Sequence, residues 1–118
     1  MDEFELIHEF EDRHLAYLIY EGAYCLAKPE PFYEPLKTLF KDWRQRIYRF
    51  DDDIGASVIL YKPVSKNTMT WDIMLAQFFG EQPFDFKHSN QILSNLAWRE
   101  VQRWLDYIKS GKGKDLLS

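Results

Sequence analysis

Apolar side chains recur at steps of three and four residues along most of this chain, and no other feature of the sequence constrains the fold as strongly. Residues spaced in this way share one face of an α-helix, so the spacing predicts amphipathic helices that pack through their apolar faces. We therefore expect a mostly α fold, a single compact domain of four to five helices. Proline and glycine separate the predicted elements, at Pro29, Pro31, Pro63, Gly80 and Gly111.

The first predicted helix covers residues 4–26. Glu21 is the only charged residue between positions 15 and 27, so this part of the chain should be buried. A short β-hairpin or strand around residues 15–27, with its turn at Glu21, is the alternative. A second helix is predicted over residues 34–50, because Pro35 suits the first turn of a helix and an apolar stripe follows it.

Residues 54–62 fit two predictions. Their β-branched and aromatic side chains favour a strand, whereas the aspartates just before them favour the cap of a short helix. A further apolar stripe over residues 71–79 predicts a third helix, which Gly80 ends as a C-terminal cap.

The last predicted helix has the longest run of helical spacing. It starts at Ser89 or Asn90, and Gly111 ends it. No internal repeat or long linker divides the chain, so residues 1–110 should form one globular helical domain. Residues 111–118 are expected to be a flexible C-terminal tail.

The composition of the 118 residues excludes several classes of protein. Aromatic residues make up 17% of the chain, which excludes disorder, and a single cysteine excludes a disulfide scaffold. No apolar run approaches the ~18 residues that a membrane helix needs, so no membrane partner is expected. The acidic start lacks the positive segment of a secretory signal, which predicts a cytoplasmic protein.

Candidate catalytic and metal-binding residues are few. His8, Glu11 and His14 follow one another at three-residue steps, and the last two form the Glu-x-x-His unit of di-metal bundles. Such bundles need two of these units, and the sequence holds one. The three residues are therefore interpreted as partly exposed polar side chains, with a weak metal site as the alternative. No phosphate-binding loop or nucleophile elbow is present, so we expect no cofactor and no catalytic residue.

Charge is distributed unevenly along the chain. Residues 1–21 hold seven acids and one arginine, whereas the predicted second helix is basic. Two interpretations follow: these segments neutralise each other within the chain, or the acidic surface steers a basic partner toward it. The formal net charge of −4 counts against a general nucleic-acid binder, which should carry a basic surface.

In size, acidity and low cysteine content, the chain resembles bacterial immunity proteins, which neutralise cognate toxins, and phage-encoded inhibitors of host defence. The resemblance implies a non-enzymatic inhibitor that occludes a protein partner, such as a basic toxin or nuclease domain, through an acidic, aromatic-bearing surface. The residues expected to bind this partner are carboxylates and aromatic anchors, namely Glu5, Glu9, Asp12, Asp51, Asp52, Asp53, Tyr33 and Tyr48. A nucleic-acid-associated regulator that uses the basic helix 35–50 is the alternative.

Overall fold

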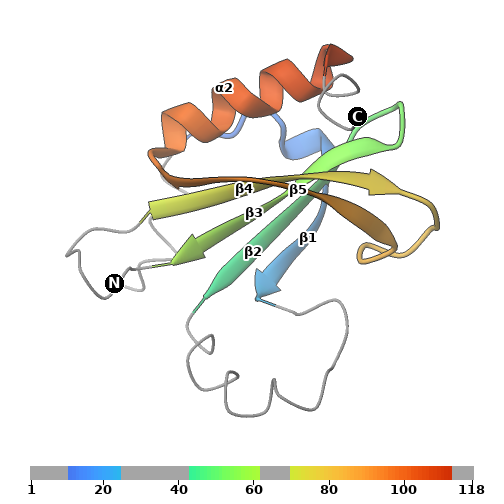
Figure 1. Cartoon of the computed structure of the whole chain (residues 1–118), viewed down its shortest axis with the longest axis horizontal. Helices are drawn as coiled ribbons and strands as arrows, with labels where there is room; N and C mark the ends of the chain where they lie inside the picture. The colour runs from blue at the N-terminus through green and yellow to red at the C-terminus, as the bar shows by residue number, and fades with distance from the viewer. Residues whose placement is uncertain (1–10, 25–42, 62–69, 113–118) are drawn as a thin grey trace.

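In the part of the chain that the structure describes, five strands form one antiparallel sheet in sequence order (Figure 1). The computed structural model describes residues 11–24, 43–61 and 70–112. The strands are β1 (Leu18–Ala23), β2 (Arg44–Arg49), β3 (Ile54–Tyr61), β4 (Thr70–Phe78) and β5 (Phe86–Leu96). The 3-10 helix η2 (Leu15–Tyr17) precedes β1, and the α-helix α2 (Trp98–Lys109) follows β5.

The expected mostly α fold is wrong, because the described part of the chain is mostly β, with one α-helix after the last strand. The described part of the first predicted helix is η2 followed by β1, and β1 pairs with β2 instead of forming a hairpin about Glu21. The described end of the second predicted helix is β2, and the third predicted helix is β4. Residues 4–10, 25–26 and 34–42 of these predictions lie outside the described residues.

The other predictions were closer to the structure. Residues 54–61 form β3, so the strand was the correct one of the two alternatives. The last predicted helix is correct only in its second half, which is α2, while its first half belongs to β5. The expectation of one compact domain is confirmed, although the domain is not helical. Most of the predicted flexible tail, residues 113–118, lies outside the described residues.

The helical spacing was misleading for β4 because both faces of this strand are covered. When both faces of a strand are buried, apolar residues occupy adjacent as well as alternate positions, and a short stretch then also fits the period of a helix. Trp71, Ile73 and Leu75 belong to the core beneath α2, whereas Ala76 and Phe78 belong to a second apolar cluster. The apolar positions of β4 therefore fitted the period of a helix, although the segment is a strand.

The main core lies between α2 and the face of the sheet that α2 crosses (Figure 1). Cross-strand neighbours on this face stack side by side, since Tyr48 pairs with Ala56 and Ala56 pairs with Leu75. The buried members of this core are Tyr48, Phe50, Ile54, Ala56, Val58, Leu60, Trp71, Ile73, Leu75, Trp98, Val101, Leu105 and Ile108. A smaller buried cluster of Ile47, Ala76 and Phe78 lies on the opposite face.

The tight connection between β2 and β3 depends on a glycine. A Cβ atom on Gly55 would lie 1.8 Å from the backbone oxygen of Tyr48, which no side chain can tolerate without a shift of the backbone. Gly55 pairs with Arg49 directly beside the turn. The close approach of the two backbones therefore requires glycine at this position.

Helix α2 keeps the amphipathic pattern that predicted it. Val101, Leu105 and Ile108 are buried and lie at steps of three and four residues. The side chain of Glu100 accepts a hydrogen bond of 3.0 Å from the backbone N–H of Ala97, which satisfies one donor at the start of the helix. No helix in the described ranges combines the length and the apolar character needed to cross a membrane.

Candidate functional site

The residues that the sequence suggested for partner binding fall into three groups in the structure. Glu5, Glu9 and Tyr33 lie outside the described residues. Asp12 and Tyr48 lie in a buried polar network beneath α2. The three aspartates at positions 51–53 form the turn between β2 and β3, where Asp51 and Asp53 are exposed. The structure thus brings Asp12 and Tyr48 together, but it places the aspartate turn elsewhere.

Asp12 is the centre of the buried network. Its Oδ2 atom accepts hydrogen bonds of 2.7 Å from both Arg46 Nη1 and the hydroxyl of Tyr48. Its Oδ1 atom accepts a bond of 2.9 Å from the backbone N–H of His14 and one of 3.3 Å from Gln102 Nε2. All these donors belong to the same chain, and the side chain of Asp12 is only 6% exposed. Asp12 therefore stabilises the fold and does not face a partner in this structure.

His14 joins the same network to α2. Its side chain is 1% exposed, with Nδ1 3.2 Å from Gln102 Oε1 and Nε2 2.8 Å from Asp106 Oδ1. The backbone N–H of Arg13 also donates to Gln102 Oε1, at 2.9 Å, which identifies this atom as the amide oxygen. Both ring nitrogens therefore face acceptors, and only a ring protonated at both nitrogens can donate to both.

These contacts bear on the predicted alternative of a metal site. Both nitrogens of His14 are taken up by α2, while His8 lies outside the described residues. Within the ranges 11–24, 43–61 and 70–112, no three His, Cys, Asp or Glu side chains are grouped so that they could hold a metal ion.

Arg46 is a buried cation between β1 and α2. It forms an ion pair of 3.2 Å with Glu21 in addition to the pair with Asp12, and its guanidinium lies 5.6 Å from the ring centroid of Trp98. Burial raises the pKa of the neighbouring Tyr48 hydroxyl well above its usual range, so Tyr48 acts as a hydrogen-bond donor in this network. Arg46 thus neutralises acids of its own chain, as the intramolecular interpretation of the charge pattern predicts.

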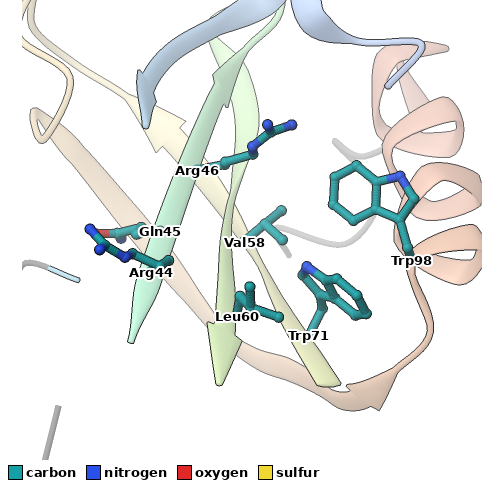
Figure 2. A pocket seen from close by; sticks show the side chains of 7 residues that line it. All are labelled: Arg44, Gln45, Arg46, Val58, Leu60, Trp71 and Trp98. Carbon is teal, nitrogen blue, oxygen red and sulfur yellow. The ribbon is translucent and has the colours of Figure 1, made fainter. Parts of the chain in front are cut away.

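A small hollow lies beside Arg46, between the sheet and the start of α2. Figure 2 shows Val58, Leu60, Trp71 and Trp98 gathered on the side of the strands to which Arg46 points. Its volume is about 10 Å³, which is room for about one water molecule. Pockets that bind small molecules measure ~300–1,000 Å³, so this hollow cannot hold a small organic substrate.

The exposed residues best suited to bind a protein partner lie at one end of the sheet, on the right-hand side of Figure 1. It comprises Asp51 and Asp53 of the β2–β3 turn together with Phe79 and Glu81 of the β4–β5 connection, and we call it the acidic end. Phe79 is 75% exposed, the largest value among the exposed large apolar residues described. Aromatic side chains are enriched among the anchors of protein interfaces, which makes Phe79 the candidate anchor of this surface.

Hydrogen bonds hold the two parts of the acidic end together. Arg49 donates to Asp53 Oδ1 at 2.8 Å and to the backbone oxygen of Gly80 at 2.6 Å, so one guanidinium bridges the turn and the connection. The backbone N–H of Phe78 donates to the backbone oxygen of Asp53 at 2.8 Å. Asp53 has a φ of 61°, a left-handed conformation that aspartate tolerates better than most residues. The carboxylates and Phe79 are therefore presented on a fixed backbone.

Only part of this surface is predicted from the sequence. Asp51 and Asp53 are among the predicted contact residues, whereas Phe79 falls on the apolar stripe of a predicted helix and Glu81 belongs to no predicted site. The neighbouring residue Phe78 is buried, and the backbone leaves the strand directly after it. A reading of residues 70–78 as a strand would have indicated that two adjacent phenylalanines cannot both point into the same core.

The basic residues of the predicted helix 35–50, the alternative site for nucleic acid, are placed differently from the expectation. Arg44, Arg46 and Arg49 lie on strand β2, whereas Lys37 and Lys41 lie outside the described residues. Arg46 is paired with Asp12 and Glu21, and Arg49 is paired with Asp53. These two side chains neutralise carboxylates of their own chain and do not line a basic helix face.

Comparison of the chain with protein-family models, with curated proteins and with solved structures gave no match.

Proposed function

We propose that this protein is a non-enzymatic inhibitor that occludes a basic protein partner through the acidic end. The observation that carries the proposal is the 75% exposure of Phe79 beside Asp51, Asp53 and Glu81. An exposed phenylalanine has no role in the core of its own chain, whereas it can fill a pocket on a partner. The carboxylates around it form charge-assisted hydrogen bonds with the lysines and arginines of that partner.

The distribution of charge supports a cationic partner. The acidic turn and the connection after β4 present carboxylates together, and Arg49 is the cation that the structure places between them. Negative charge at one end of a protein attracts a basic partner and raises the rate of association. A toxin nuclease must present cations to its phosphate substrate, so its active face has the complementary charge.

The hollow beside Arg46 is too small for a small organic substrate, and the proposed role requires none. It has room for about one water molecule, and Arg46 beside it is paired with Asp12 and Glu21 of its own chain. A protein of this kind acts by covering a surface. Among inhibitors of this class, a bacterial immunity protein that neutralises its cognate toxin agrees with the small size and negative charge of the chain.

The proposal can be tested by affinity capture from the native host with three immobilised forms of the protein. We expect wild type to retain a basic protein, and Phe79→Ala to retain at least about tenfold less of it, as for the loss of a central anchor. Leu15→Ala is the matched control, since Leu15 is 58% exposed but belongs to η2 and not to the acidic end.

The captured protein is then purified and its association rate is measured at increasing salt. Asp51→Lys and Glu81→Lys should slow association and weaken its salt dependence, whereas the dissociation rate should change less. Equal binding by wild type, Phe79→Ala and Asp51→Lys would show that the partner uses a different surface. Retention of an acidic partner would contradict the proposed electrostatic complementarity.

A further inference from the structure

We propose that His14 is a pH-sensitive clasp, which holds residues 12–17 against α2 while its ring is protonated and loosens this segment when the ring loses a proton. In an ordinary environment, histidine is the side chain that changes charge between about pH 5 and 8. The ring of His14 is buried, and its two nitrogens contact Gln102 and Asp106, which lie one turn apart on α2. The clasp is a property of this chain alone and does not depend on the partner proposed above.

Both contacts of the ring are made with acceptors. An ionised carboxylate such as that of Asp106 can only accept hydrogen bonds. Gln102 presents its amide oxygen to the ring, and two further bonds fix this orientation, because the backbone N–H of Arg13 donates to Oε1 and the Nε2 atom donates to Asp12. Rotation of the amide would place like groups against each other in both bonds. A neutral ring has only one N–H, so it leaves its other nitrogen unpaired against an oxygen atom.

The charges around the ring match one another when His14 is protonated. Three carboxylates and two arginines pack in this network from the segment itself, β1, β2 and α2, namely Asp12, Glu21, Asp106, Arg13 and Arg46. The hydroxyl of Tyr48 keeps its proton, and Lys109 is exposed and lies over the ring of Tyr17 at 5.0 Å. A protonated His14 is the third cation for the three carboxylates. Loss of its proton leaves one negative charge unmatched in a partly buried network.

The clasped segment also supports the turn of the acidic end. The ring of His14 contacts the ring of Phe50 edge-on, with centroids 6.0 Å apart, and Tyr17 contacts the same ring at 5.0 Å. Phe50 is buried and directly precedes Asp51 of the β2–β3 turn. When residues 12–17 loosen, Phe50 loses both ring contacts. We therefore expect the turn to become less ordered together with the segment.

The direction of the pH effect follows from the hydrogen bonds. The closed segment makes one hydrogen bond more with a protonated ring of His14 than with a neutral one. The closed form is therefore favoured at low pH, and this contribution is lost as the pH rises. Because a single proton is involved, the ratio of open to closed molecules changes at most about tenfold for each pH unit.

The test is amide hydrogen exchange of the whole protein between about pH 6 and 8.5, corrected for the intrinsic effect of pH on exchange. In wild type, protection of residues 13–17 should fall at least about fivefold over this range, as for one lost hydrogen bond, and protection of residues 51–54 should fall as well. His14→Gln has no titratable ring and should lose this dependence. His88→Gln is the matched control and should behave like wild type, since His88 is an exposed histidine of β5. All other titrating groups are common to the three proteins.

A second measurement needs no variant and covers the case in which His14→Gln fails to fold. The nitrogen NMR shifts of the His14 ring report how many of its nitrogens carry a proton. We expect two protons at about pH 6, and the loss of one should coincide with the loss of amide protection as the pH rises. A ring with a single proton at pH 6, protection in wild type that does not change with pH, or the same pH dependence in wild type and His14→Gln would each overturn the proposal.

Discussion

Asp12 and Arg46 form an ion pair of 2.7 Å in the interior of the protein, with side chains that are 6% and 5% exposed. Asp12 precedes the first strand and Arg46 lies in β2, so the pair fixes the N-terminal part of the described chain against the sheet. Tyr48, Gln102 and the backbone of His14 donate further hydrogen bonds to the same carboxylate. The network of Asp12 thus connects the segment before β1, strand β2 and helix α2.

We predict that Asp12→Ala lowers the free energy of unfolding by about 3 kcal/mol, because it leaves the buried donors of Arg46 and Tyr48 without their acceptor. The measurement is urea denaturation followed by circular dichroism. Asp51→Ala removes an exposed carboxylate and should stay within about 0.5 kcal/mol of wild type. Equal stability of the two variants would show that Asp12 does not hold the core network together.

Gln102→Leu should also destabilise the protein, by about 1–3 kcal/mol, since it leaves buried polar groups unpaired. Gln102 bridges Asp12, the ring of His14 and the backbone of Arg13, and it is buried on α2. The control is Gln82→Leu, which changes an exposed glutamine in the β4–β5 connection. If chemical denaturation gives the same midpoint for both variants, the bridge contributes nothing to stability.

Asp72 gives a prediction for the dependence of stability on pH. Burial raises the pKa of its carboxyl group, although hydrogen bonds from the backbone of Asn95 and from the side chains of Tyr61 and Ser94 act in the opposite direction. A raised pKa in the folded state means that the contribution of Asp72 to stability is complete below its ordinary pKa of ~3.9. This contribution is lost as the pH rises through the folded pKa.

We therefore expect Asp72→Asn to be more stable than wild type at neutral pH, with a difference that shrinks as the solution is acidified to about pH 4. The asparagine keeps an oxygen that can accept the hydrogen bond from Asn95. The measurement is urea denaturation of both proteins across this pH range. A wild type that is more stable than Asp72→Asn at neutral pH would show that the hydrogen bonds outweigh the cost of burial.

The adjacent residues Phe78 and Phe79 should respond very differently to the same change. Phe78 is buried in the smaller apolar cluster, so Phe78→Ala should cost about 3–5 kcal/mol of stability. Phe79 is largely exposed, and Phe79→Ala should stay within about 0.5 kcal/mol of wild type. Thermal denaturation of the two variants checks both values. A large loss of stability in Phe79→Ala would mean that this residue serves the fold and not a partner.

Elements that depend on local interactions could be predicted from the amino-acid sequence alone. The stripe of Val101, Leu105 and Ile108 has one buried face and one exposed face, so its period predicted α2 correctly. The β-branched residues of 54–61 likewise made a strand one of the two predictions there, and the structure has β3. The exposed carboxylates of Asp51 and Asp53 also follow from a polar turn between apolar segments.

The pairing of the strands and the roles of the buried polar residues depend on contacts that form only in the folded protein. Strand β4 is buried on both faces, so its period was ambiguous, and its hydrogen bonds are made with the neighbouring strands β3 and β5 and not within its own segment. In the same way, Asp12 and Tyr48 look like surface groups in the sequence, yet the fold brings them together with Arg46 in the interior. Whether a polar side chain faces water or a buried partner depends on residues far away in the sequence. A short stretch of sequence does not contain both partners, so it cannot predict their contact.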